Sequence, residues 1–371
     1  FMSNFAVDTA GMAENFEKEF EELKKNTKRP NILILGQTGV GKSSLINCIF
    51  GKKLAEVSDI KPETRGFHYY QDENTPVNII DSEGYELEKS EEFIPALKAF
   101  VQESFKDVTK QVHIAWYCIS TPSARILPFD IQNIKVLVEQ KVPVAVVLTK
   151  CDLDDPDGTK AKGISDVVKK EFNGKIKTFQ TSNDNEVNEC LDIKALISWS
   201  VDNISDENLK KGFIIAQKAD LECKYDAAKS RIKYYAGCAA AIGGSPIPMS
   251  DAVALTALQI TMTADIFHIY GIDNSFANLA KNFVQSKVVS MVGKMVAGNL
   301  IKLIPGFGSA AGAAVNATVA ATITYSMGYT ICIIARKAVE SEWEGSELVE
   351  NIFSEEYFNQ AFEQGSKMKN E

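Results

Sequence analysis

The sequence predicts an α/β domain, built on a mostly parallel six-stranded sheet with helices on both faces, followed by an all-helical domain. Short apolar runs alternate with helical stretches as far as about residue 200, a pattern that is typical of strand–helix–strand units. A glycine-rich turn joins the first apolar run to the first helical stretch, and no convincing strand follows about residue 205. The predicted strands are 31–35, 66–71, 77–80, 112–119, 143–149 and 176–179.

The chain begins with a charged amphipathic segment that predicts a lead-in helix. Phe16, Phe20 and Leu23 share one face of this helix, and Pro30 ends it. Further helices are predicted over 42–51, 91–109, 129–140, 160–172 and, as one long charged helix, about 206–236. The predicted domains are therefore 1–29 for the lead-in helix, 30–203 for the α/β domain and 204–371 for the helical domain.

The composition is that of an ordinary globular chain, with 45% apolar and 24% charged residues. The formal net charge of -9 argues against a nucleic-acid partner, because neutralising phosphates requires a basic surface. The seven cysteines include no Cys-x-x-Cys pair, which indicates reduced thiols in a cytoplasmic protein. The N-terminus shows no basic stretch followed by an apolar core, so we expect no secretory signal.

The glycine-rich turn carries the most specific motif in the chain. It reads Gly36-Gln37-Thr38-Gly39-Val40-Gly41-Lys42-Ser43-Ser44 and fits the pattern Gly-x-x-x-x-Gly-Lys-Ser/Thr, which cradles nucleotide phosphates. The glycines let backbone N–H groups turn inward, and the following helix adds its positive end. Lys42 supplies a charge for the β and γ phosphates, and the hydroxyl of Ser43 is a ligand for Mg²⁺.

A second motif, Asp81-Ser82-Glu83-Gly84, ends an apolar strand after this turn. Asp81 at the carboxyl end of a neighbouring strand is placed to hold Mg²⁺, usually through water. Gly84 has no side chain, so its N–H can approach the γ phosphate. The pattern Asp-x-x-Gly is common by itself, and its weight comes from its position after the phosphate loop.

The third motif, Thr149-Lys150-Cys151-Asp152, follows the apolar strand 143–149 and selects the base. A carboxylate at Asp152 can accept hydrogen bonds from the N1–H and 2-amino groups of guanine. Adenine offers no such pair of donors. The stem of Lys150 can lie over the base ring.

Together these motifs make residues 30–200 resemble the translation-factor-related P-loop GTPases, especially their Era-like branch. The resemblance implies an α/β P-loop GTPase fold that binds GTP or GDP with Mg²⁺ and hydrolyses GTP. It implies that Thr64 is the switch threonine, which closes over Mg²⁺ and the γ phosphate. It also implies that Thr181-Ser182-Asn183 is the last guanine motif, with the backbone N–H of Ser182 at the guanine carbonyl.

The chain departs from this family at three positions. Thr149 stands where relatives often have asparagine, and Gly39 stands where potassium-activated relatives have asparagine. Tyr85 follows Gly84 where many relatives have a glutamine that orients the attacking water, so we expect slow intrinsic hydrolysis. Arg65 is either a charge stabiliser or a surface residue of the switch. Help from a second copy, in a homodimer across the nucleotide face, is one way to replace the missing glutamine.

The helical domain resembles an apolar helical domain of unknown function that follows an Era-like GTPase domain in a set of bacterial proteins. It is more distantly similar to the immunity-related GTPases, whose helical domains work at membranes. No charged side chain occurs from Leu303 to Ala335, a stretch long enough to span a membrane. Asn316 and several threonines dilute it, and the partner segment 251–271 contains Asp251, Asp265 and His268.

Two functions therefore remain open for the whole chain. In the first, it is a soluble GTPase switch coupled to a helical effector domain. In the second, it is a nucleotide-gated module that binds a membrane or a partner through residues 235–335 and turns over GTP incidentally. Ribosome association rests on analogy with Era-like relatives alone.

Overall fold

The computed structural model describes residues 9–51, 61–63, 66–72, 75–82, 90–184, 187, 191–244, 250–272, 317–344 and 355–367. The chain forms two compact units. Thr27–Asp220 make the α/β unit, whereas Phe1–Asn26 and Leu221–Glu371 together make the helical unit. The predicted domain boundaries lay after residues 29 and 203, whereas the boundaries of the two units lie after residues 26 and 220. The lead-in helix belongs with the helices at the other end of the chain.

The α/β unit contains a seven-stranded sheet in the order β2-β3-β4-β1-β5-β6-β7. Its strands are β1 (Asn31–Leu35), β2 (Lys61–Glu63), β3 (Phe67–Asp72), β4 (Thr75–Ser82), β5 (Ile114–Ser120), β6 (Val144–Thr149) and β7 (Lys177–Gln180). The five strands from β4 to β7 in this order run parallel, while β2 and β3 are antiparallel additions at one edge. The predicted fold class is confirmed, and all six predicted strands are present. The seventh, β2, has three residues, too few for a hydrophobic period to show in the sequence.

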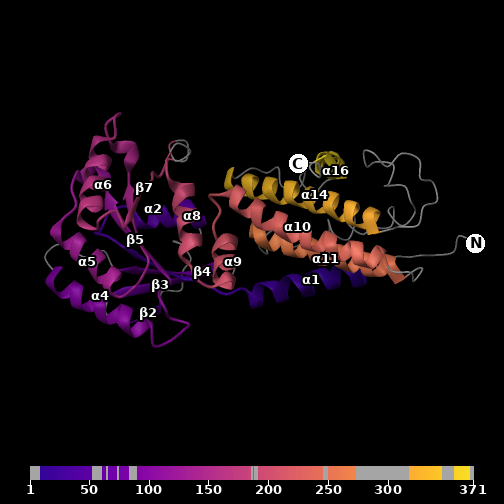
Figure 1. Ribbon diagram of the computed structural model, residues 1–371, viewed down its shortest axis with the longest axis horizontal. Helices are drawn as coiled ribbons and strands as arrows, with labels where there is room; N and C mark the ends of the chain where they lie inside the picture. The colour runs from indigo at the N-terminus through magenta and orange to yellow at the C-terminus, as the bar shows by residue number, and fades with distance from the viewer. Residues whose placement is uncertain are drawn as a thin grey trace, which may run out of the picture. The chain divides into compact units, whose positions relative to one another are not determined.

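Helices cover both faces of this sheet (Figure 1). They are α2 (Lys42–Phe50), α4 (Ser90–Ser104), α5 (Pro128–Glu139), α6 (Thr159–Glu171), α8 (Ile193–Asn203) and α9 (Glu207–Ala216), with short 3-10 turns η2 (Thr121–Ser123) and η3 (Cys151–Leu153). Alternate residues of a strand point to opposite faces. Tyr117 on β5 therefore packs in the core under α4, α5 and α6. Trp116 points to the other face, where it stacks on Phe50 of α2 and meets Phe213 of α9.

The helical unit contains α1 (Thr9–Asn26), α10 (Leu221–Gly243), α11 (Ser250–Tyr270), α14 (Ala317–Glu344) and α16 (Glu355–Lys367). Phe16 and Phe20 of α1 are buried in its core, and Phe16 packs edge-on against Phe267 of α11 with ring centroids 6.3 Å apart. The predicted apolar face of the lead-in helix is thus a packing face, and its partner lies beyond the α/β unit in the sequence.

The single helix predicted over 206–236 is wrong, because the chain breaks between α9 and α10. Gln217 adopts an extended conformation and is fully buried. Its side-chain amide donates to the carbonyl oxygen of Asp220 and accepts from the Asp220 N–H, both at 2.8 Å. This clamp stabilises a turn that separates the two helices at the boundary between the two units.

The centre of the helical unit is α14, which packs against α10, α11 and α16. Two glycines allow close helix crossings there. A Cβ atom added to Gly328 would lie 2.6 Å from Ile232 of α10, and one added to Gly365 of α16 would lie 2.9 Å from the carbonyl oxygen of Ser326. Ala317–Glu340 is long and apolar enough to cross a membrane, with a mean hydropathy of 1.4, yet 72% of that window is buried inside the protein. Core helices of soluble proteins pass the same test.

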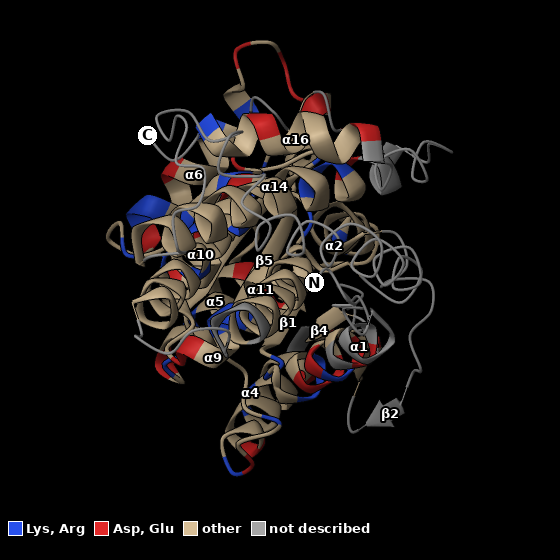
Figure 2. Ribbon diagram, turned by 90° about the vertical axis from the view of Figure 1, so that its right-hand side faces the viewer, with Lys and Arg blue, Asp and Glu red and all other residues tan. Residues whose placement is uncertain are grey.

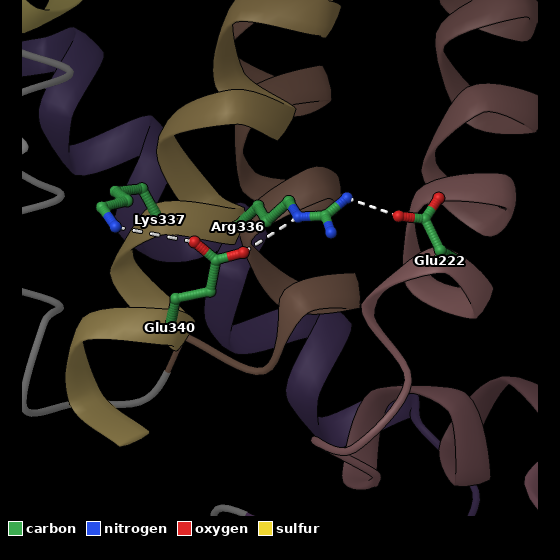
Figure 3. Close-up of polar contacts among 4 residues, drawn as sticks. All are labelled: Glu222, Arg336, Lys337 and Glu340. Atoms are coloured by element: carbon green, nitrogen blue, oxygen red, sulfur yellow. Dashed lines mark hydrogen bonds and ion pairs between the residues drawn. The ribbon is translucent and has the colours of Figure 1, made fainter. Parts of the chain in front are cut away.

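Charged residues mark the outer helices of this unit. Figure 2 shows blue and red segments along α1 and α16, whereas most of α11 is tan. One polar network joins the start of α10 to the last turns of α14 (Figure 3). Arg336 donates to Glu222 at 2.6 Å and to Glu340 at 3.0 Å, and Lys337 lies 3.7 Å from the second oxygen of Glu340.

Two further polar contacts lie inside the helical unit. The carboxylate of Asp265 is fully buried in α11 and is paired with Arg231 of α10, with the hydroxyl of Tyr235 3.3 Å away. Lys224 is also fully buried, and its ammonium donates to the carbonyl oxygen of Ile269 at 2.9 Å, in the last turn of α11. Both contacts satisfy polar groups that burial would otherwise penalise.

Candidate nucleotide-binding site

The phosphate loop leaves the buried strand β1 and enters α2 through three glycines with positive φ. The φ angles are 143° at Gly36, 77° at Gly39 and 104° at Gly41, values that L side chains rarely adopt. Gly36 is also needed for space, because a Cβ atom there would lie 2.5 Å from the carbonyl oxygen of Cys118 on β5. The loop is therefore a backbone structure that only glycine permits at these positions.

Lys42 is the first residue of α2 and lies over this loop. Its side chain is only 8% exposed, and its ammonium donates to the carbonyl oxygen of Gly36 at 3.0 Å and to that of Gln37 at 3.4 Å. The same nitrogen lies 3.8 Å from Oδ1 of Asp81. A largely desolvated cation at the N-terminus of a helix is suited to binding phosphate.

Asp81 lies at the end of β4, beside β1, with Ile34 as its register partner. Burial raises the pKa of its carboxyl to about 6, and the charges of Lys42 and His68 oppose that rise. Its buried Oδ1 accepts no hydrogen bond from any residue that the structure describes. A buried carboxylate oxygen without a donor fits a hydrated divalent cation.

These residues therefore suit Mg²⁺, with Ser43 exposed in the first turn of α2 as the nearby hydroxyl ligand. Within the described residues, no group of three or more His, Cys, Asp or Glu side chains could hold a metal ion by itself. The arrangement matches Mg²⁺ that is held jointly by nucleotide phosphates and a few protein oxygens, as is usual for this ion.

The base motif and the last motif lie at the ends of two neighbouring parallel strands, β6 and β7. Asp152 lies in η3 directly after β6, and Ser182 follows β7. The hydroxyl of Ser182 donates to Oδ1 of Asp152 at 2.6 Å. Thr181 ties the two strand ends together by accepting from the Cys151 N–H at 3.1 Å. Asp152 and Asn183 are exposed, so both side chains are open to a ligand.

The base motif also contacts the phosphate loop. The hydroxyl of Thr149 donates to the carbonyl oxygen of Val40, and the ammonium of Lys150 donates to the carbonyl oxygen of Gly39 at 2.7 Å. Thr149 is buried and lies against Gly41. A Cβ atom added to Gly41 would lie 3.5 Å from the Cβ atom of Thr149. The structure thus brings the phosphate loop, Asp81 and the base motif to one edge of the sheet.

Several sequence-predicted site residues cannot be placed in this geometry. Thr64, Arg65, Gly84 and Tyr85 lie outside the described residues. Among the other predicted residues, Thr38 and Ser44 lie in the loop and in α2 as expected, exposed and half-buried respectively.

The sequence interpretation missed His68 on β3, which lies directly opposite Asp81 in the antiparallel pair β3–β4. The signal was available in principle, since the chain between these strands is short enough for a hairpin. Without the register, however, the partner of Asp81 could not be selected.

Comparison with known proteins identifies the family of the α/β unit. Residues 31–150 match the family described as "50S ribosome-binding GTPase". The chain is 30% identical over 124 residues to a probable GTP-binding protein EngB from Aquifex aeolicus, covering 33% of this chain and 67% of that protein. The chain belongs to the P-loop GTPase family.

A second EngB relative agrees with this family. The probable EngB from Caldanaerobacter subterraneus is 33% identical over 126 residues, covering 34% of this chain and 64% of that protein. A crystal structure of a probable GTP-binding protein engB is 18% identical, with a TM-score of 0.35, and covers 47% of this chain and 98% of that one. P-loop GTPases bind GTP or GDP with Mg²⁺ and hydrolyse GTP, so the α/β unit is a GTPase domain. The family match and the two EngB sequences identify the GTPase family and do not single out its Era-like branch.

Proposed function

We propose that this chain is a Mg²⁺-dependent guanine-nucleotide switch in the cytoplasm, in which the helical unit is the effector element. GTP binding orders the phosphate-sensing residues, and hydrolysis to GDP and phosphate releases them. Lys42 and the amides of the phosphate loop stabilise the charge that develops on the transferred phosphoryl group. Thr64 and Gly84 sense the γ phosphate in this proposal, and Tyr85 keeps intrinsic turnover slow.

Guanine selectivity is supported by the position of Asp152. Its carboxylate is exposed after β6 and is oriented by the Ser182 hydroxyl at 2.6 Å. A carboxylate is acceptor-only, so it favours a base edge that presents two donors. Guanine presents N1–H and a 2-amino group, while adenine and xanthine each place an acceptor at one of these positions.

Coupling to the helical unit rests on one observation within the α/β unit. The N–H of Lys218, in the segment that leads into α10, donates to the carbonyl oxygen of Ile49 at 2.7 Å. Ile49 lies in the last turn of α2, whose first turn carries Lys42 and Ser43. A shift of α2 on phosphate binding therefore acts directly on the segment that joins the two units.

Nucleotide selectivity is tested by calorimetric titration of the full chain with GTP, ITP, XTP and ATP. We expect GTP to bind most tightly and ITP, which lacks the 2-amino donor, to bind about 10- to 100-fold more weakly. XTP and ATP should not compete with GTP for the site. Asp152→Asn should remove this order, while Asp157→Asn, an exposed carboxylate in the following loop, serves as the matched control. ATP binding as tight as GTP binding would contradict the assignment of Asp152.

Coupling is tested by hydrogen exchange on the full chain, with a non-hydrolysable GTP analogue and with GDP. We expect protection in α10 and α14 to differ between the two nucleotides. If α10 and α14 are protected equally with the GTP analogue and with GDP, the helical unit is not part of the switch. This conclusion would hold whatever the nucleotide selectivity of the site.

The second candidate function is a nucleotide-gated membrane module, and the apolar helix α14 is the observation that favours it. Flotation with anionic vesicles, in GTP analogue and in GDP, separates the two candidates. Nucleotide-dependent flotation supports the membrane module, and measurable turnover without flotation supports the soluble switch.

A homodimer across the nucleotide face is part of the proposal, because a second copy can supply what Tyr85 lacks. Light scattering in GDP and in GDP with aluminium fluoride tests it. We expect the mass to double only in the transition-state mimic, and a monomer in both states would contradict the dimer.

A further inference from the structure

We propose that His68 is a positioning residue for Asp81, which it holds in the orientation that the Mg²⁺–nucleotide complex requires. This inference rests on the proposed function, since it assumes that Asp81 serves the metal. It concerns a residue that none of the sequence motifs contains.

The register of the sheet puts these two side chains together. β3 and β4 are antiparallel, and His68 is the direct partner of Asp81. Directly opposed residues of an antiparallel pair project from the same face of the sheet, with Cβ atoms about 4.5–5.5 Å apart. His68 is half-buried at this position, and its charge favours the ionised form of the Asp81 carboxylate.

Asp81 therefore has two basic neighbours from different elements. The ammonium of Lys42 in α2 lies 3.8 Å from its Oδ1, and His68 of β3 is its register partner across the strand pair. Both favour the ionised carboxylate against the burial that raises its pKa to about 6. When phosphates engage Lys42, the imidazole remains as the neighbour that limits the rotation of this carboxylate.

Groups that orient a metal-binding carboxylate contribute to metal affinity without touching the metal. The expected effect of losing His68 is therefore specific. The concentration of Mg²⁺ that retains GDP should rise by about tenfold, as is typical for such outer-shell partners. Binding of GDP in the presence of chelator should not change, because that binding depends on the phosphate loop and the base motif.

The experiment measures release of a fluorescent GDP analogue from the full chain as a function of Mg²⁺ concentration. His68→Leu removes the imidazole, and His68→Gln keeps a polar side chain beside Asp81. Gln71→Leu, an exposed position on the same strand, is the matched control for a change in β3. Thermal unfolding of each variant shows whether the fold is retained.

We expect His68→Leu to raise the Mg²⁺ midpoint by about tenfold, His68→Gln to restore part of the loss and Gln71→Leu to match the wild type. An unchanged midpoint in His68→Leu, or an equal loss in all three variants, would overturn the inference. Failure of the proposed function looks different. In that case the wild-type chain itself would release GDP at a rate independent of Mg²⁺.

Discussion

The hydroxyl of Thr149 donates a hydrogen bond to the carbonyl oxygen of Val40, which joins the base motif to the phosphate loop across 109 positions of the chain. A second acceptor, the carbonyl oxygen of Ile119, lies 3.3 Å from the same hydroxyl. Threonine at this position therefore supplies a side-chain donor to the loop, although relatives often have asparagine. These contacts join the two halves of the site through the protein's own groups.

We expect Thr149→Val to weaken GDP binding by about 5- to 30-fold, corresponding to about 1–2 kcal/mol. Valine keeps the shape and removes the hydroxyl, so the buried Val40 carbonyl loses its donor. Thr149→Ser retains the donor and should bind GDP nearly as well as the wild type. Calorimetric titration checks both variants, and equal affinity for Val and wild type would show that the contact does not order the site.

Gly36 and Gly39 allow a matched test of the loop. Both have positive φ, so alanine is strained at either position. Only Gly36 also lacks space, because its added Cβ would meet the Cys118 carbonyl oxygen at 2.5 Å, whereas nothing lies within 4 Å of one added to Gly39. We expect Gly36→Ala to lower the free energy of unfolding by about 2 kcal/mol more than Gly39→Ala. Denaturant titration in chelator measures this difference, and equal effects would contradict the close packing on β5.

Gly328 sets the distance between α14 and α10. We expect Gly328→Ala to destabilise the helical unit by about 1–3 kcal/mol, because the added methyl would lie 2.6 Å from Ile232. The helix propensity of alanine offsets about 1 kcal/mol of this cost. The double variant Gly328→Ala, Ile232→Ala should be more stable than the sum of the single changes predicts.

The control for that prediction is Gly237→Ala, in α10. Gly237 is exposed and has open space around an added Cβ, so alanine there should stabilise by up to about 1 kcal/mol. Urea unfolding gives all four values. Additive effects at positions 232 and 328 would show that the two side chains do not meet.

Phe20 tests whether α1 belongs to the helical unit. It is 6% exposed, stacks on Phe16 with centroids 5.8 Å apart and meets the ring of His268 at 6.0 Å. We expect Phe20→Ala to lower the stability of the helical unit by about 3–5 kcal/mol while GDP affinity stays unchanged. Glu22→Ala, exposed on the same helix, should have little effect. A loss of GDP affinity with an intact helical unit would instead assign α1 to the α/β unit.

Local sequence patterns were sufficient for much of this structure. The six predicted strands and the loop Gly36–Ser44 depend on alternation, apolar runs and glycine positions, which act over a few residues. The meeting of Asp152 and Ser182 could also be expected, since the ends of neighbouring parallel strands lie at one edge.

The missing parts depend on contacts between distant residues. The break at Gln217 comes from a side-chain clamp on Asp220, which overrides the helical propensity of the flanking segments. The pairing of His68 with Asp81 depends on the register of β3 and β4. The apolar face of α1 predicted that this helix packs against another element. It did not identify α11 as that element.

The position of α1 in the chain has a consequence for how the protein is made. Synthesis releases Phe16 and Phe20 first, but their partner Phe267 and the rest of α11 emerge only after the whole α/β unit. Domains generally fold as units while the chain is being made. The GTPase domain can therefore fold while the apolar face of α1 is still exposed to solvent. The helical unit therefore assembles last, once α11 has emerged and can cover the apolar face of α1.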